Sequence, residues 1–190
     1  MDIAQPVTLL LATLTIIGQL LVLSYILLWI GKKFSQTLHS GYTKVSFLFS
    51  QKVLLFSVIV ALVATLGSLF YSEIALYEPC RLCWFQRIFM YPQVILFGVA
   101  LWKKTTGVIK YIIPLSIIGG LISAYHYFIQ IRGIAQPAVL DACSITGVSC
   151  VSTQFLTFGY ITIPLMALTA FIILIMLGLV SQKAESPELI

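Results

Sequence analysis

Two pairs of cysteines are the main reactive groups of this 190-residue chain. Cys80 and Cys83 form a C-x-x-C pair, and Cys143 and Cys150 follow later in the sequence. A C-x-x-C pair typically cycles between dithiol and disulfide, because one of its thiols has a lowered pKa. A disulfide that closes so small a ring stabilises a fold only weakly. The pattern therefore predicts electron transfer by thiol–disulfide exchange, with static bracing of loops as the alternative.

A zinc site is a further alternative, because four thiolates can bind this ion in a tetrahedral arrangement. The spacing between Cys143 and Cys150 is wider than in a usual zinc knuckle. Nothing else in the sequence indicates a structural need for a metal. We therefore expect no metal ligands among these residues.

The residues that follow the first pair add charge and polarity. Cys83 directly precedes a helix expected to begin near Trp84, and the positive end of the helix dipole favours a thiolate there. Arg87 lies four residues further and should share a helical face with Cys83. We expect Arg87 to stabilise negative charge on Cys83 or on a carbonyl-bearing acceptor, with snorkelling to headgroups as the alternative. Gln86 is expected to donate a hydrogen bond nearby, or to face a neighbouring helix.

His126 is a further candidate, since a histidine inside an apolar span is a functional candidate by default. It could relay protons to a bound acceptor. Flanked by Tyr125 and Tyr127, it could also simply hydrogen-bond a neighbouring helix.

The composition indicates that membrane-spanning helices position the cysteines and the polar residues near them. Hydrophobic residues make up 60% of the chain and charged residues 9%, and the mean hydropathy is +1.06. These values exclude an ordinary soluble domain. Apolar runs of about 20 residues, enough to span a bilayer, predict an all-α integral membrane protein with five spans. The runs are 6–30, 53–71, 84–102, 111–131 and 158–180. The first run lacks the basic start and cleavage site of a signal peptide, so we expect a retained helix.

The charges predict the orientation of the spans. All lysines fall in segments 31–52 and 103–110 and in the C-terminal tail. The other connections carry arginines and acidic residues. Because positive loops stay in the cytoplasm, we expect the N-terminus and both cysteine pairs to lie outside the cell membrane. The compartment outside the cell membrane is commonly oxidising, which favours disulfide formation between paired cysteines.

Several motifs resemble the DsbB/BdbC family of membrane disulfide-bond formation proteins. The main one is EPCRLCWFQRI at 78–88, followed by MYP at 90–92. The segments AYHY at 124–127, GVSC at 147–150 and GYITIP at 159–164 match the BdbC branch at corresponding places. The resemblance implies a four-helix redox domain over residues 50–182. By the distribution of lysines, we expect residues 183–190 to form a cytoplasmic tail.

The resemblance also implies an activity, a cofactor and a partner. Family members pass electrons to a membrane quinone, ubiquinone or menaquinone, and reoxidise a thioredoxin-like thiol oxidase of the DsbA type. By this resemblance, Cys143 would form the mixed disulfide with the partner and Cys150 would exchange with Cys80. Cys83 and Arg87 would lie next to the quinone.

Residues 1–49 depart from the family pattern, because typical members have four spans and begin inside. The extra helix could be a packing partner, an assembly surface or part of the quinone boundary. Two other functions stay open. One is a quinone reductase resembling vitamin K epoxide reductase, an enzyme that shares the helical-bundle architecture and the use of paired redox-active cysteines. The other is a non-enzymatic membrane scaffold whose loops are braced by disulfides or zinc.

Overall fold

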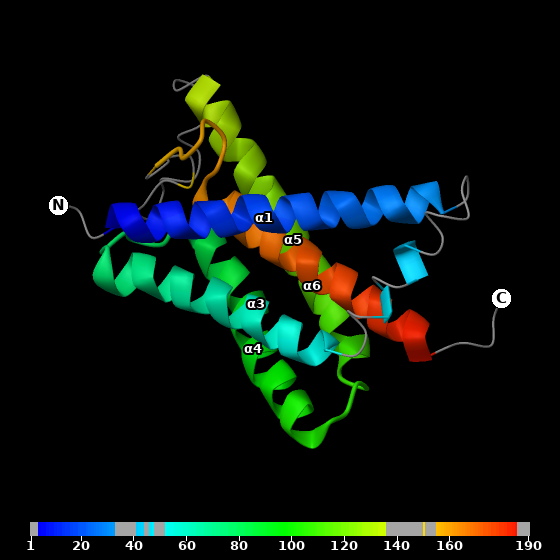
Figure 1. The fold of residues 1–190 in the computed structure, drawn as a ribbon. Helices are drawn as coiled ribbons and strands as arrows, with labels where there is room; N and C mark the ends of the chain where they lie inside the picture. Colours follow the sequence, from blue (N-terminus) through cyan, green and yellow to red (C-terminus); the bar gives the residue numbers. More distant parts are fainter. Residues whose placement is uncertain are drawn as a thin grey trace.

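Long helices make up most of the part of the chain that the structure describes (Figure 1). The computed structural model describes residues 4–32, 41–43, 46–47, 52–135, 150 and 155–185. Within them, five helical segments are long and apolar enough to cross a membrane. They are α1 (Ala4–Gly31), α3 (Val53–Leu69) continued by the π-helix η1 (Phe70–Ile74), α4 (Arg81–Lys103), α5 (Ile109–Ala135) and α6 (Ile163–Glu185). The prediction of an all-α integral membrane protein with five spans is confirmed.

Helices α3 to α6 form a four-helix bundle, and α1 lies against its outside (Figure 1). Helix α5 packs along α6 and α3 packs along α4, while α1 rests on α6. The core contains Phe97 of α4, Ile112 of α5 and Phe171 of α6. A Cβ atom at Gly119 of α5 would lie 2.3 Å from Cζ of Phe171. The missing side chain therefore lets α5 and α6 approach closely, as small residues do in membrane bundles.

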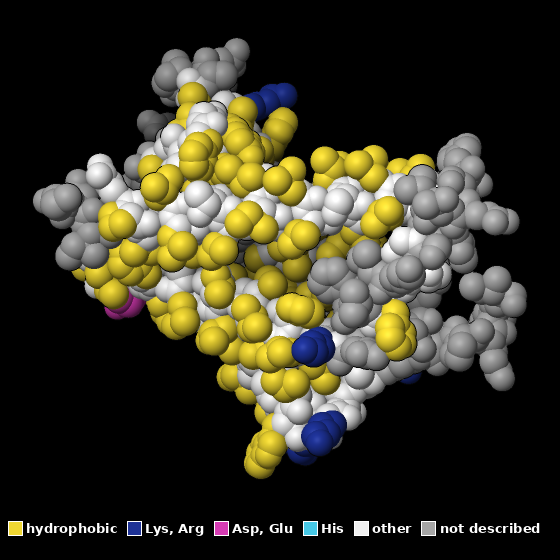
Figure 2. All heavy atoms as spheres, viewed as in Figure 1, with side chains coloured by type: hydrophobic (Ala, Val, Ile, Leu, Met, Phe, Trp, Pro, Cys, Tyr) yellow, Lys and Arg dark blue, Asp and Glu magenta, His cyan; other side chains and the backbone are white. Residues whose placement is uncertain are grey.

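The outside of the bundle is apolar. Figure 2 shows hydrophobic side chains over most of the described surface on the face that carries α1 and α3. Leu10, Leu20 and Leu27 of α1 are 58–60% exposed. An apolar surface of this extent is far larger than soluble monomers expose, so lipid is its natural environment.

Two helix starts differ from the sequence predictions by three residues or more. Helix α4 begins at Arg81, earlier than the expected 84, because the chain turns into the helix directly after Cys80, which is extended (φ −69°, ψ 171°). Helix α6 begins at Ile163, later than the expected 158. There Phe158 and Gly159 have positive φ angles of 52° and 79°. These angles form a tight turn, so the apolar sequence before Ile163 is not helical.

Candidate functional site

The two cysteines of the C-x-x-C pair lie at the start of α4. Cys80 is the residue before the first helical turn, and its carbonyl accepts a hydrogen bond from the backbone N–H of Trp84 at 3.2 Å. Cys83 lies within that first turn, so the helix places the two sulfurs side by side. Their Sγ atoms are 3.5 Å apart, with the Cys80 thiol as the donor. The expectation that Cys83 precedes the helix is wrong; Cys80 occupies that position.

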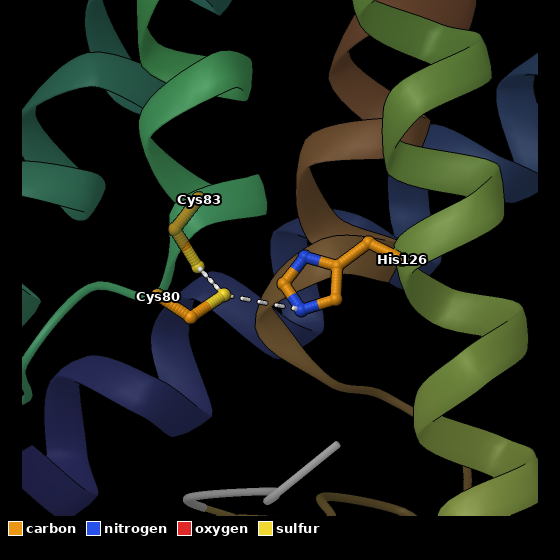
Figure 3. Close-up of side chains that lie close together, drawn as sticks. All are labelled: Cys80, Cys83 and His126. Carbon is orange, nitrogen blue, oxygen red and sulfur yellow. Dashed lines mark hydrogen bonds between the residues drawn. The ribbon is translucent and has the colours of Figure 1, made fainter. Parts of the chain in front are cut away.

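His126 of α5 points toward this pair (Figure 3). Its Nε2 lies 3.7 Å from Sγ of Cys80, and its Nδ1 lies 3.0 Å from Nε2 of Gln86. The Gln86 amide nitrogen carries only donors, so Nδ1 of the ring must accept. A neutral His126 therefore carries its proton on Nε2, on the side of Cys80. His126 is 1% exposed, so no competing bulk solvent reaches this arrangement.

Cys150 completes the cluster from the outer connection. It is 2% exposed and packs with Cys80 and Ile129. Its backbone carbonyl lies 3.2 Å from Nε2 of His126, so it can accept the ring proton. One sulfur of the second pair is thus brought beside the first pair. Cys143 lies outside the described residues.

The pKa of Cys80 is raised to about 11. The main cause is the hydrogen bond that its thiol donates to Cys83, and burial acts in the same direction. The contacts with His126 and Cys150 lower the pKa and so oppose this shift. At neutral pH Cys80 therefore holds its proton when the pair is reduced.

Arg87 has a partner inside the bundle. Its Nε donates to Oγ of Ser68 at 3.0 Å, and one of its terminal nitrogens donates to the Ser68 carbonyl at 3.1 Å. The hydroxyl of Tyr91 also donates to Oγ of Ser68, at 3.2 Å. The guanidinium carbon lies 5.2 Å from the ring centroid of Trp84. These contacts hold the charge of Arg87 between α3 and α4.

Cys80, Cys83 and Arg87 line one cavity of about 490 Å³. His126, Gln86 and Cys150 also line it. The volume lies within the range of about 300–1,000 Å³ usual for small-molecule sites. The cavity is mostly apolar, and its polar groups gather around the cysteine pair. It could hold a planar redox molecule with its polar atoms near Arg87 and Cys83.

The same cluster contains metal-ligand types. The ligand atoms of Cys80, Cys83 and His126 all lie within 4.8 Å of one another. Two thiolates and an imidazole are ligands that zinc accepts. Among the described residues, the geometry therefore keeps the zinc alternative available, with His126 as a ligand that the sequence prediction did not include.

Ser68 is a site residue that the sequence predictions missed. It lies in an apolar helix whose sequence gives no sign of which face meets α4. The signal that could have found it is the need of a membrane arginine for a partner. Serine in a neighbouring span is a common hydrogen-bonding residue in such bundles.

Comparison with known proteins extends these observations. The family model for "Disulfide bond formation protein DsbB" matches residues 50–181, which contain the whole cluster. The chain belongs to the DsbB family. Within this family, "Disulfide bond formation protein C" of Bacillus subtilis is 45% identical over 130 residues, covering 67% of this chain and 91% of that protein. "Probable disulfide formation protein" of Oceanobacillus iheyensis is 45% identical over 139 residues, covering 72% and 92%. No solved structure matches.

Membership of the DsbB family confirms the resemblance that the C-x-x-C motif indicated. It supports the prediction of a membrane thiol oxidoreductase. Helix α1 precedes the residues that the DsbB family model matches. The roles assigned to the individual cysteines, Arg87, Gln86 and His126 stay predictions.

Proposed function

We propose that this protein reoxidises an extracytoplasmic thiol oxidase with a thioredoxin fold and passes the electrons to a membrane quinone. One observation carries the proposal. The Cys80–Cys83 pair contacts Cys150 and also lines the cavity that contains Arg87. A pair in this position can receive electrons from the outer connection and deliver them to a ligand inside the bundle.

The first exchange takes place between the partner and the second cysteine pair. A thiolate of the partner attacks Cys143 of the Cys143–Cys150 disulfide, and Cys150 leaves as a thiolate. The second thiolate of the partner then attacks the partner's first sulfur, which is bonded to Cys143 in the mixed disulfide, and releases Cys143 as a thiolate. The partner has lost two electrons and now carries a disulfide, while Cys143 and Cys150 are reduced. Each step exchanges one thiolate for another, as thiol–disulfide exchange requires.

The second exchange takes place inside the cluster. The Cys150 thiolate attacks Cys80 of the Cys80–Cys83 disulfide, and Cys83 leaves. Cys143 then attacks Cys150, restores the second disulfide and releases Cys80. His126 supports this release, because its Nε2–H faces the Cys80 sulfur at 3.7 Å and can donate to the developing charge.

The last step regenerates the first disulfide. When bound, a quinone accepts two electrons and two protons and leaves as a quinol. The Cys80 and Cys83 thiols supply both electrons and both protons when their sulfurs rejoin. Arg87 is positioned by Ser68 to attract the polar atoms of the ligand. His126 is the buried group that can move a proton between Cys80 and the cavity.

The test uses the purified full-length chain, a reduced thioredoxin-like oxidase and a quinone. Wild-type protein should catalyse quinone reduction, and Cys83→Ser should reduce the rate to that of the uncatalysed mixture. Equal rates for the two proteins would contradict the proposal. The orientation is tested separately: a membrane-impermeant thiol reagent should label the reduced cysteines in intact cells.

The close approach of Cys80, Cys83 and His126 favours a second candidate, a scaffold braced by zinc. Metal analysis of the purified chain separates the two functions. A zinc scaffold should contain about one zinc ion per chain and should unfold with a chelator. The oxidoreductase should contain none and should lose thiols when quinone is added.

A further inference from the structure

Helix α1 packs against the four-helix bundle along one narrow stripe of residues. Its buried residues are Thr8, Ala12, Thr15 and Gly18. Their spacing of three or four places them on one face of the helix. Most other side chains of α1 are apolar and are exposed or half-buried, and hydrophobic side chains of α1 cover much of the face seen in Figure 2. Contacts through this stripe determine where α1 lies.

The stripe touches α6 closely. A Cβ atom at Gly18 would lie 2.8 Å from Cδ1 of Ile173, so the absent side chain allows the contact. Gln19, the residue after Gly18, donates a hydrogen bond from its Nε2 to Oγ1 of Thr169 of α6 at 3.3 Å. Its Oε1 accepts a hydrogen bond from the Tyr160 hydroxyl at 3.0 Å. Small residues and polar contacts of this kind hold membrane helices together.

Near its N-terminal end, α1 reaches η1 and the C-terminal part of α3. The hydroxyl of Tyr71 donates to Oγ1 of Thr8 at 3.1 Å. A Cβ atom at Gly67 would lie 3.0 Å from Cδ1 of Leu11. Helix α1 therefore contacts α3 at this end and α6 further along.

The space between α1 and α3 belongs to the cavity that contains the cysteine pair. Its walls include Leu14, Ile17 and Leu21 of α1 and Phe56 and Ile59 of α3. Figure 2 shows this face hollowed between the two helices, with hydrophobic side chains at the rim. From Phe56 to Ser68, α3 lines the cavity over about 18 Å at the rise of 1.5 Å per residue. The cavity is thus an apolar groove whose polar end is at Arg87 and Cys83.

We propose that α1, which lies outside the residues matched by the family model, closes this groove as its outer wall and so contributes to binding of the isoprenoid chain of the quinone. The proposal rests on the quinone-dependent function proposed above. A membrane quinone has a polar ring and a long apolar chain. The groove has the matching polarity, with Arg87 at one end and apolar side chains of α1, α3 and α6 along its length. Because the chain and the ring would share one continuous cavity, α1 contributes to quinone affinity without touching the reacting sulfurs.

Paired substitutions in α1 test this role. Leu14→Trp places a large ring in the groove, whereas Leu20→Trp adds the same ring to the exposed face of the helix. Each protein is assayed in detergent with a long-chain quinone and with a quinone that has no chain. The ratio of the two KM values should rise about tenfold in Leu14→Trp and should stay at the wild-type value in Leu20→Trp.

A second pair of variants protects the test against misfolding of α1. Ala64→Phe narrows the groove from α3, and Leu62→Phe is its control because Leu62 is 41% exposed and lies outside the groove lining. An unchanged KM ratio in both Leu14→Trp and Ala64→Phe would overturn the inference. A groove that binds a phospholipid acyl chain and not the quinone would give the same unchanged KM ratio, which equally contradicts the inference. Failure of the wild-type protein to reduce either quinone would instead contradict the proposed function itself.

Discussion

Gln86 of α4 and His126 of α5 are joined by a buried hydrogen bond of 3.0 Å from Nε2 to Nδ1. This bond determines which ring nitrogen of His126 carries the proton. The protonated Nε2 faces Cys80 and the carbonyl of Cys150. One amide thus prepares the imidazole to donate to a sulfur during thiol exchange.

Gln86→Leu should slow the exchange between the two cysteine pairs about tenfold. The variant removes the donor to Nδ1, so the ring proton no longer has a fixed position. It also leaves a buried nitrogen unpaired, which should lower the free energy of unfolding by about 1–3 kcal/mol. Single-turnover reduction with a small dithiol measures the exchange rate, and thermal unfolding in detergent measures stability.

Gln93→Leu is the matched control for this variant. Gln93 is also buried in α4 and bonds α5, because its Oε1 accepts from the Ser116 hydroxyl at 2.9 Å. The Gln93→Leu protein should have a lower free energy of unfolding but keep the wild-type rate of exchange between the two cysteine pairs. Equal rate losses in both variants would mean that Gln86 acts only through packing.

The alkylation of Cys80 should have a pH midpoint near its raised pKa of about 11. Because a hydrogen bond to Cys83 is the main cause, Cys83→Ala should move the midpoint to lower pH. Iodoacetamide labelling of the reduced protein, followed by mass spectrometry of the Cys80 peptide, measures both profiles. Identical midpoints would exclude the Cys83 contact as the cause.

The same raised pKa affects stability. Between the ordinary value of 9.0 and about 11, the folded chain keeps a proton on Cys80 that the unfolded chain has lost. The contribution of this group to stability is therefore complete below pH 9 and is lost as the pH rises through this window. Unfolding of the reduced protein at pH 8 and at pH 11 should show the loss, and Cys80→Ala should diminish it.

The four cysteines should separate into two functional pairs. Cys80→Ser and Cys83→Ser should abolish quinone reduction with any electron donor, because the pair next to the cavity is then incomplete. Cys143→Ser should block turnover with the thioredoxin-like partner but allow reduction of quinone by a small dithiol. Stopped-flow measurement of quinone absorbance distinguishes these cases. Loss of both activities in Cys143→Ser would argue against separate roles.

Arg87→Ala should raise the apparent KM for quinone about tenfold or more, because hydrogen bonds to charged groups contribute about 1.5–3 kcal/mol. Ser68→Ala should have a smaller effect, since the Ser68 carbonyl still accepts one bond from Arg87. Steady-state assays at several quinone concentrations give both values. If the KM of Arg87→Ala equals that of the wild type, Arg87 does not bind the quinone and serves to join α4 to Ser68 of α3.

The sequence by itself determined the class of the protein and the identity of its reactive groups. Long apolar runs can satisfy their backbone groups in lipid only as helices or closed barrels, and their length fits helices. The C-x-x-C spacing alone brings Cys80 and Cys83 within reach of each other, because one helical turn separates them. Local geometry of this kind is readable from the order of residues.

The tertiary structure alone decided which helices share the site. The five spans are mostly apolar and have no pronounced amphipathic stripe, so their sequences do not indicate the face that meets a neighbour. Lipid chains are as apolar as leucine, and packing shape therefore selects the contacts. The bonds from Arg87 to Ser68 and from Gln86 to His126 depend on this selection. So does the position of α1 beside the cavity, where Gly18 and Gly67 permit close contact with α6 and α3.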